Sequence, residues 1–123
     1  MREGTIEHRL ARANESYRGS GGRSEENRDY GFRPAFFDYA SQKLYLSRFA
    51  DGNPAPMHLL DGLPEEVVVD RAPSGRVLRT RASLVAGFER KGMFYSRKAA
   101  ARAVAALRSR RTLRSEAARR LVP

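Results

Sequence analysis

The fold is decided by the stretch Pro34-Ala-Phe-Phe-Asp-Tyr-Ala-Ser-Gln-Lys-Leu-Tyr-Leu-Ser47. Its two halves are rich in aromatic and aliphatic residues, and Tyr39 to Gln42 supply a turn, so the stretch predicts a β-hairpin. The register that follows has four pairs: Asp38 with Lys43, Phe37 with Leu44, Phe36 with Tyr45, and Ala35 with Leu46. Apolar pairs then lie on both faces of the hairpin. We expect one face to be covered and the other to be covered or to bind a partner, with Phe36 and Tyr45 as candidate contact residues.

Two further hairpins follow along the chain. Glu65–Val69 and Arg76–Arg81 flank a Pro- and Gly-containing turn, and Val77 and Leu78 are expected to face Val69 and Val68.

The last hairpin joins Ser83–Phe88 to Met93–Ser96. Gly92 suits the left-handed position of a three-residue loop, in which Phe88 pairs with Phe94.

The end of the chain predicts a helix with a basic continuation. Ser96 is a candidate N-cap, and an apolar stripe recurs at helical spacing in the four residues Ala100, Ala103, Val104 and Leu107. Arginines interrupt the stripe beyond Arg108, so we expect a docked helix over 97–108. Residues 109–123 are expected to form a frayed continuation or a basic tail.

These elements predict an α+β fold, a small antiparallel sheet built from hairpins with one C-terminal helix packed on it. Residues 31–108 form the β-rich globular domain of this prediction. Residues 1–30 are predicted to be a flexible N-terminal arm, because the Gly/Ser-rich stretch 17–27 has nothing to bury. A short helix from Thr5 to Glu15 would need a partner to be stable.

Positive charge gathers at one end of the chain. The net charge is +10, and residues 76–123 hold fourteen basic and two acidic side chains. All but three of the 24 basic residues are arginine, whose planar guanidinium binds phosphate well, although a GC-rich genome also favours arginine. The asymmetry indicates an acidic partner. The candidate nucleic-acid-binding residues are Arg97, Lys98, Arg102, Arg108, Arg110, Arg111 and Arg114.

The sequence lacks the residues that several classes of functional site require. The chain has no cysteine, which excludes a disulfide framework and thiolate metal sites. Of its two histidines, His8 and His58, the second has Asp61 as a possible partner ligand, but no third ligand is implied, so we expect no metal and no cofactor. No catalytic motif is present, and we expect no enzyme. No apolar run approaches the roughly 20 residues that cross a membrane, and no secretory signal opens the sequence. A cytoplasmic protein without membrane contact is expected.

Four phrases of the sequence resemble small uncharacterised proteins of proteobacterial genomic islands and integrative conjugative elements. They are Arg33–Asp38, Leu44–Gly52, Met57–Pro64 and Gly87–Ala100, and the resemblance spans residues 33–104. It implies cargo of a mobile genetic element in a Gram-negative cytoplasm. That family has no assigned activity, so the resemblance gives no residue a role.

Three hypotheses about function follow. The first is a mobile-element accessory protein that binds nucleic acid non-specifically through its Arg-rich C-terminal helix and tail. The alternative is a protein-interaction module, or an inhibitor of a host or defence complex, that engages an acidic protein surface. A further alternative is an enzyme whose site is assembled from scattered residues.

Overall fold

The computed structural model describes residues 6–120, with the side chains of residues 6–119. Within these residues, six strands form two antiparallel sheets, one of four strands in the order β2-β1-β5-β6 and one of two strands, β3 and β4. The strands are β1 (Arg33–Asp38), β2 (Lys43–Leu46), β3 (Val68–Arg71), β4 (Val77–Thr80), β5 (Leu84–Arg90) and β6 (Met93–Ser96). Helix α3 (Arg97–Arg120) follows the last strand and packs on the larger sheet. The predicted α+β fold, a hairpin-built sheet with a C-terminal helix, is confirmed.

The first hairpin has the predicted register. Strand β1 pairs with β2 from Asp38↔Lys43 to Ala35↔Leu46. Strand β1 is also the partner of β5, with Phe36 opposite Ala86 and Phe37 opposite Val85. The first hairpin therefore supplies a central strand of the larger sheet.

The registers predicted for the other two hairpins are wrong. Strands β3 and β4 pair Val68 with Thr80 and are shifted by irregularities on either side of Asp70. In the last hairpin Phe88 pairs with Tyr95 and Phe94 with Glu89.

The error in the last hairpin comes from its turn. Lys91 (φ 54°) and Gly92 (φ 82°) both adopt positive φ. This is the geometry of a two-residue turn, and it shifts the pairing by one residue from a three-residue loop.

Both hydrophobic clusters lie on one face of the larger sheet. Phe36 packs in one cluster with Ile6 of helix α1 (Ile6–Ser16). Phe88 packs in the other with Ala100 and Val104 of α3. Residues that pair directly across antiparallel strands share a face, so the opposite face of the sheet is reached by neither cluster.

The N-terminal segment is helical where a flexible arm was predicted. After α1, the chain forms the short helix α2 (Ser24–Asn27) and the 3₁₀ turn η1 (Arg28–Tyr30). The expectation that residues 17–27 bury nothing is wrong, because Asn27 is fully buried and its Nδ2 donates to the carbonyl of Gly21. Helix α1 confirms the short helix predicted from Thr5 to Glu15. The predicted start at Thr5 lies outside the described residues.

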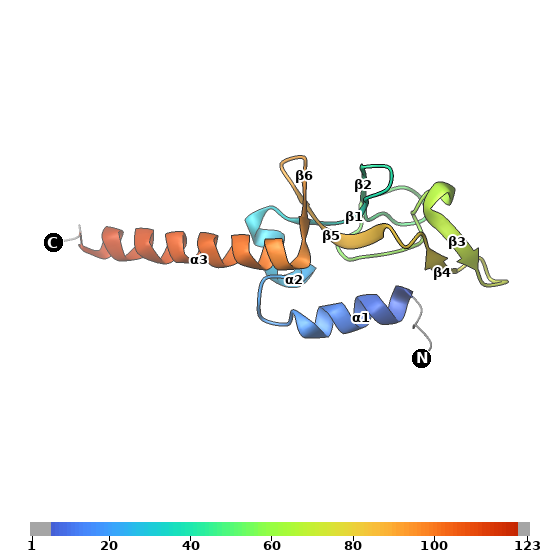
Figure 1. Ribbon diagram of the computed structural model, residues 1–123. Coiled ribbons are helices and arrows are strands. Elements are labelled where there is room, and N and C mark those ends of the chain that lie inside the picture. Colours follow the sequence, from blue (N-terminus) through green and yellow to red (C-terminus); the bar gives the residue numbers. More distant parts are fainter. Residues whose placement is uncertain (1–5, 121–123) are drawn as a thin grey trace.

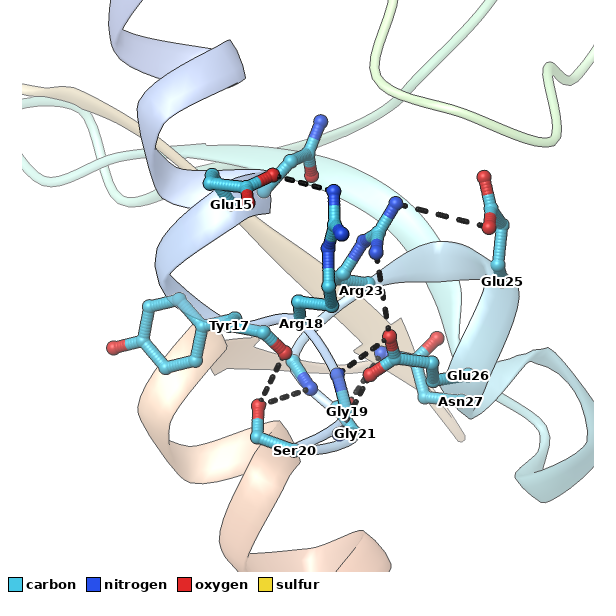
Figure 2. Close-up of polar contacts among 12 residues, drawn as sticks. Glu15, Tyr17, Arg18, Gly19, Ser20, Gly21, Arg23, Glu25, Glu26 and Asn27 are labelled. Carbon is cyan, nitrogen blue, oxygen red and sulfur yellow. Dashed lines mark hydrogen bonds and ion pairs between the residues drawn. The ribbon is translucent and has the colours of Figure 1, made fainter.

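A carboxylate orders the loop between α1 and α2. Glu26 accepts hydrogen bonds from the backbone N–H groups of Gly19 and Gly21, at 2.8 and 3.1 Å (Figure 2). Gly21 has φ +89°, and a Cβ there would lie 2.7 Å from the side chain of Val104. The glycine therefore lets this loop approach α3 closely.

Helix α3 is longer than predicted. The Ser96 cap is confirmed, since its Oγ accepts the N–H of Ala99 at 3.0 Å. The helix continues past Arg108 to Arg120 and spans 24 residues, or about 36 Å. Alanine, arginine and leucine favour helix, and no glycine or proline interrupts 97–120. The predicted tail is thus helical as far as residue 120, and its last three residues lie outside the described part.

Helix α3 has a packed half and a projecting half. In Figure 1 its red C-terminal half runs away from the strands and from α1. The buried residues of the helix end at Val104, with Leu107 half-buried. The first three turns therefore anchor the helix, and the rest carries side chains into solvent.

Candidate nucleic-acid interface

Arg97 is a core residue, which corrects its place in the predicted binding surface. It is 5% exposed, and its Nη1 donates to Asn14 Oδ1 at 2.8 Å and to the carbonyl of Gly22 at 2.9 Å. Its guanidinium lies 5.7 Å from the centre of the Phe88 ring. Burial lowers the pKa of Arg97. The residue ties α1 and its following loop to the sheet and is not available to an external phosphate.

Four of the predicted arginines gather where α3 leaves the globular domain. The guanidinium carbon of Arg111 lies 4.7 Å from the centre of the Tyr30 ring, and that of Arg108 lies 6.0 Å away. Arg110 and Arg114 line a hollow of about 200 Å³ with the same ring. We call Tyr30, Arg108, Arg110, Arg111 and Arg114 the Tyr30 cluster.

The two remaining predicted cations lie elsewhere on the helix. Lys98 and Arg102 are exposed and one turn apart. At about 100° per residue they lie opposite the stripe of Ala100 and Val104. The predicted continuous cationic track is therefore divided between the outer side of the packed half and the Tyr30 cluster on the projecting half.

The cations of α3 differ from most other exposed cations in their pairing. Outside the helix, ion pairs join Arg18 to Glu15, Arg23 to Glu25 and Glu26, Arg33 to Glu89, Lys43 to Glu66, Arg71 to Glu65, Arg76 to Glu7 and Arg81 to Asp38. Figure 2 shows those of Arg18 and Arg23. In the described part of the chain, none of the ion pairs involves a residue of the projecting half, nor Lys98 or Arg102. The positive charge of the helix is left for solvent ions or for a partner.

Phe36 and Tyr45, the predicted contact residues of the first hairpin, do not form an exposed surface. The expectation that Phe36 contacts a partner is wrong. Its side chain is fully buried, with its ring centre 5.4 Å from that of His58. Tyr45 is half-buried, and its hydroxyl donates to Glu66 Oε1 at 2.5 Å. This hydrogen bond is the main reason why the pKa of Tyr45 is raised. The two side chains belong to the covered face.

The opposite face of the sheet carries aromatic residues that were not among the predicted contact residues Phe36 and Tyr45. Phe37 stacks on Phe94, with ring centres 5.2 Å apart and planes 24° apart. Tyr39 is 55% exposed and contacts Phe37 edge to face. The sequence could have indicated this placement, because side chains alternate along a strand and Phe37 must point away from the face that holds Phe36.

The described residues offer no other recognised site. Residues 6–120 contain no group of three or more His, Cys, Asp or Glu residues positioned to hold a metal ion. Within the same range, no helix has both the length and the apolarity needed to cross a membrane. Comparisons with protein-family models, curated proteins and solved structures gave no match.

Proposed function

We propose that this protein binds nucleic acid without sequence specificity through the projecting half of α3. The observation that carries the proposal is the difference in pairing. Six of the eleven exposed cations outside this helix in the described part of the chain form ion pairs with carboxylates. The four arginines of the Tyr30 cluster form none there, although the charge of Arg108 contributes to lowering the pKa of Glu26. A partner with a dense array of phosphates supplies the missing anions and releases its own counterions on binding.

The shape of the helix also supports a phosphate partner. A helix that projects from its domain presents side chains around much of its circumference, and its diameter suits the major groove of duplex DNA. In the Tyr30 cluster, Arg111 and Arg108 lie against an aromatic ring. This contact limits their rotamers and reduces the entropy lost when they bind phosphate. In the setting that the sequence resemblance implies, the protein is an accessory factor of a mobile genetic element.

The test compares two variants that lose equal charge at different places. The first replaces the four arginines of the Tyr30 cluster with glutamine. The matched control replaces four exposed, paired cations with glutamine, namely Arg18, Lys43, Arg71 and Arg76. Such surface ion pairs contribute about 0–1 kcal/mol each, so we expect the control to stay folded.

Fluorescence anisotropy with duplexes of unrelated sequence, single-stranded DNA and RNA measures the affinity of each protein. We expect the wild type and the control to bind all duplexes alike and the Tyr30-cluster variant to bind at least about tenfold more weakly, since each charged contact is worth about 1.5–3 kcal/mol. Equal loss in both variants would mean that net charge, and not this surface, determines binding.

A second candidate function is binding of a protein partner at the sheet face opposite the two hydrophobic clusters. The stacked pair of Phe37 and Phe94, with exposed Tyr39 beside it, favours this function because aromatic residues are enriched in interface cores. A Phe37→Ser variant should then lose a stoichiometric partner in co-purification from the host and keep nucleic-acid binding. Retention of the partner by that variant would exclude this face as the contact.

A further inference from the structure

A cavity of about 300 Å³ lies between helix α1 and strand β5. Its apolar wall comes from Ile6, Leu10 and Ala13 on the helix and from Leu84 and Ala86 on the strand. Strand β6 pairs with β5 only from Gly87 onward, so the edge of β5 is free of β6 at this place. The volume is at the lower end of the roughly 300–1,000 Å³ typical of small-molecule sites.

The polar group of the cavity is a buried arginine without an anion. Arg97 lines the cavity, and its Nη1 and Nη2 contact only neutral groups, an amide oxygen, a backbone carbonyl and the ring of His58. Its Nε is buried and has no hydrogen-bond partner among the described residues. No ion pair involves Arg97 in that part of the chain, although a buried, unpaired charge is strongly unfavourable.

The rest of the lining is also cationic and not acidic. Arg9 reaches the cavity from the exposed side of α1, and Tyr17 lines it at the end of that helix. Among the described residues, nine line the cavity and none of these is acidic. The site thus combines an apolar wall with two guanidinium groups, one of them buried with an unused N–H donor.

We propose that this cavity binds a small organic anion with an apolar body, such as an aliphatic carboxylate. The apolar body occupies the space between α1 and β5, and the carboxylate lies beside the Arg97 guanidinium as its counterion, with Arg9 as a second positive charge. A neutral apolar molecule would leave the Arg97 charge unpaired. Inorganic phosphate would leave the apolar wall in contact with water. The proposal does not depend on nucleic-acid binding.

The first test titrates the full chain with octanoate and follows amide chemical shifts by NMR. Octan-1-ol, which has the chain without the charge, and acetate, which has the charge without the chain, are the matched probes. We expect saturable shifts in α1 and in residues 84–86 with octanoate, and at least about tenfold weaker binding of both controls, because a charged hydrogen bond and the burial of the chain each contribute that much. Octanoate binding no tighter than octan-1-ol, or shifts confined to the projecting half of α3, would overturn the proposal.

Two variants separate the site from the fold. Arg97→Gln removes the charge, and we expect at least about tenfold weaker octanoate binding. Since Arg97 also joins α1 to the sheet, Ala13→Phe provides a second variant that fills the cavity without touching the arginine. It should abolish octanoate binding and keep the nucleic-acid affinity of the wild type. Unchanged octanoate binding by a folded Ala13→Phe variant would exclude this cavity as the site.

Discussion

Acid should destabilise this protein through His58, well above the pH at which carboxylates titrate. The ring lies between the aromatic rings of Phe36 and Phe88, with centres 5.4 and 5.2 Å away. Its Nε2 is 2.7 Å from the carbonyl of Gly87, and its Nδ1 is 3.4 Å from Nη2 of Arg97. This network assigns the proton to Nε2, which donates to the carbonyl, while Nδ1 accepts from the guanidinium. Burial first, and the Arg97 charge second, lower the pKa of His58 from 6.5 to about 4.

The sign and size of the effect follow from the two pKa values. As the pH falls below about 6.5, the unfolded chain binds a proton at His58 that the native state binds only near pH 4, so the free energy of unfolding decreases across this range. A difference of about 2.5 pKa units corresponds to roughly 3 kcal/mol at about 1.4 kcal/mol per unit. The contribution is complete above the unfolded-state pKa and is lost as the pH falls through the native one.

Urea denaturation of the wild type and of His58→Gln measures this contribution between about pH 7 and about pH 4.5. Glutamine retains an N–H donor for the Gly87 carbonyl and does not titrate. We expect the variant to be less stable than the wild type at neutral pH and to change far less as the pH falls. His8 is present in both proteins and so contributes equally. If the two free energies of unfolding decrease in parallel, His58 is not the group responsible, and the reasoning from its burial is refuted.

Three further predictions concern other parts of the molecule. Gly87→Ala would place a Cβ 2.3 Å from the Tyr95 backbone oxygen. Chemical denaturation should therefore show a decrease of about 1–3 kcal/mol in the free energy of unfolding. An unchanged denaturation midpoint would contradict the close pairing of β5 with β6 at this position. Hydrogen bonds from two serine hydroxyls lower the pKa of Asp38 to about 2, so wild-type stability should fall as the pH drops from 3.8 towards 2. An Asp38→Asn variant should lack that decline. An equal decline in the wild type and the variant would count against Asp38 as the group responsible. Like charges such as Arg110 and Arg114 lie one turn apart on α3 and destabilise its projecting half. Sulfate or duplex DNA should therefore increase the circular dichroism signal at the helix minimum. No increase would contradict the destabilisation of the projecting half by its like charges.

The sequence predicted the fold where local patterns act alone. The hairpin of β1 and β2 has its predicted register because aromatic pairs and the turn agree on one alignment. The last hairpin was shifted by one residue because Lys91 adopts positive φ, which is uncommon for a residue with a side chain. The helix of residues 6–16 was predicted only on condition of a partner, and that partner, the sheet core in which Ile6 packs, is a long-range contact that the sequence does not show.

The candidate site was predicted only as far as it depends on local sequence patterns. Arginine spacing indicated the exposed cations of α3 correctly, with the exception of Arg97, whose burial depends on Asn14 and Gly22 far away in sequence. Phe36 and Phe37 are adjacent and equally apolar, and only the position of the helices decides which of them is covered. Tyr30 carried no local signal, since its role comes from the direction in which α3 leaves the domain.

The most direct test of the central claim is the salt dependence of duplex DNA binding by the full chain and by the two four-site variants. Each phosphate contact contributes a slope of about −0.9 to log K against log salt, so losing the Tyr30 cluster should flatten the slope by up to about 3.6. The control variant, with the same net charge, should keep the wild-type slope. Equal slopes for both variants, whether flattened or unchanged, would contradict the claim that the unpaired arginines of α3 form the binding surface.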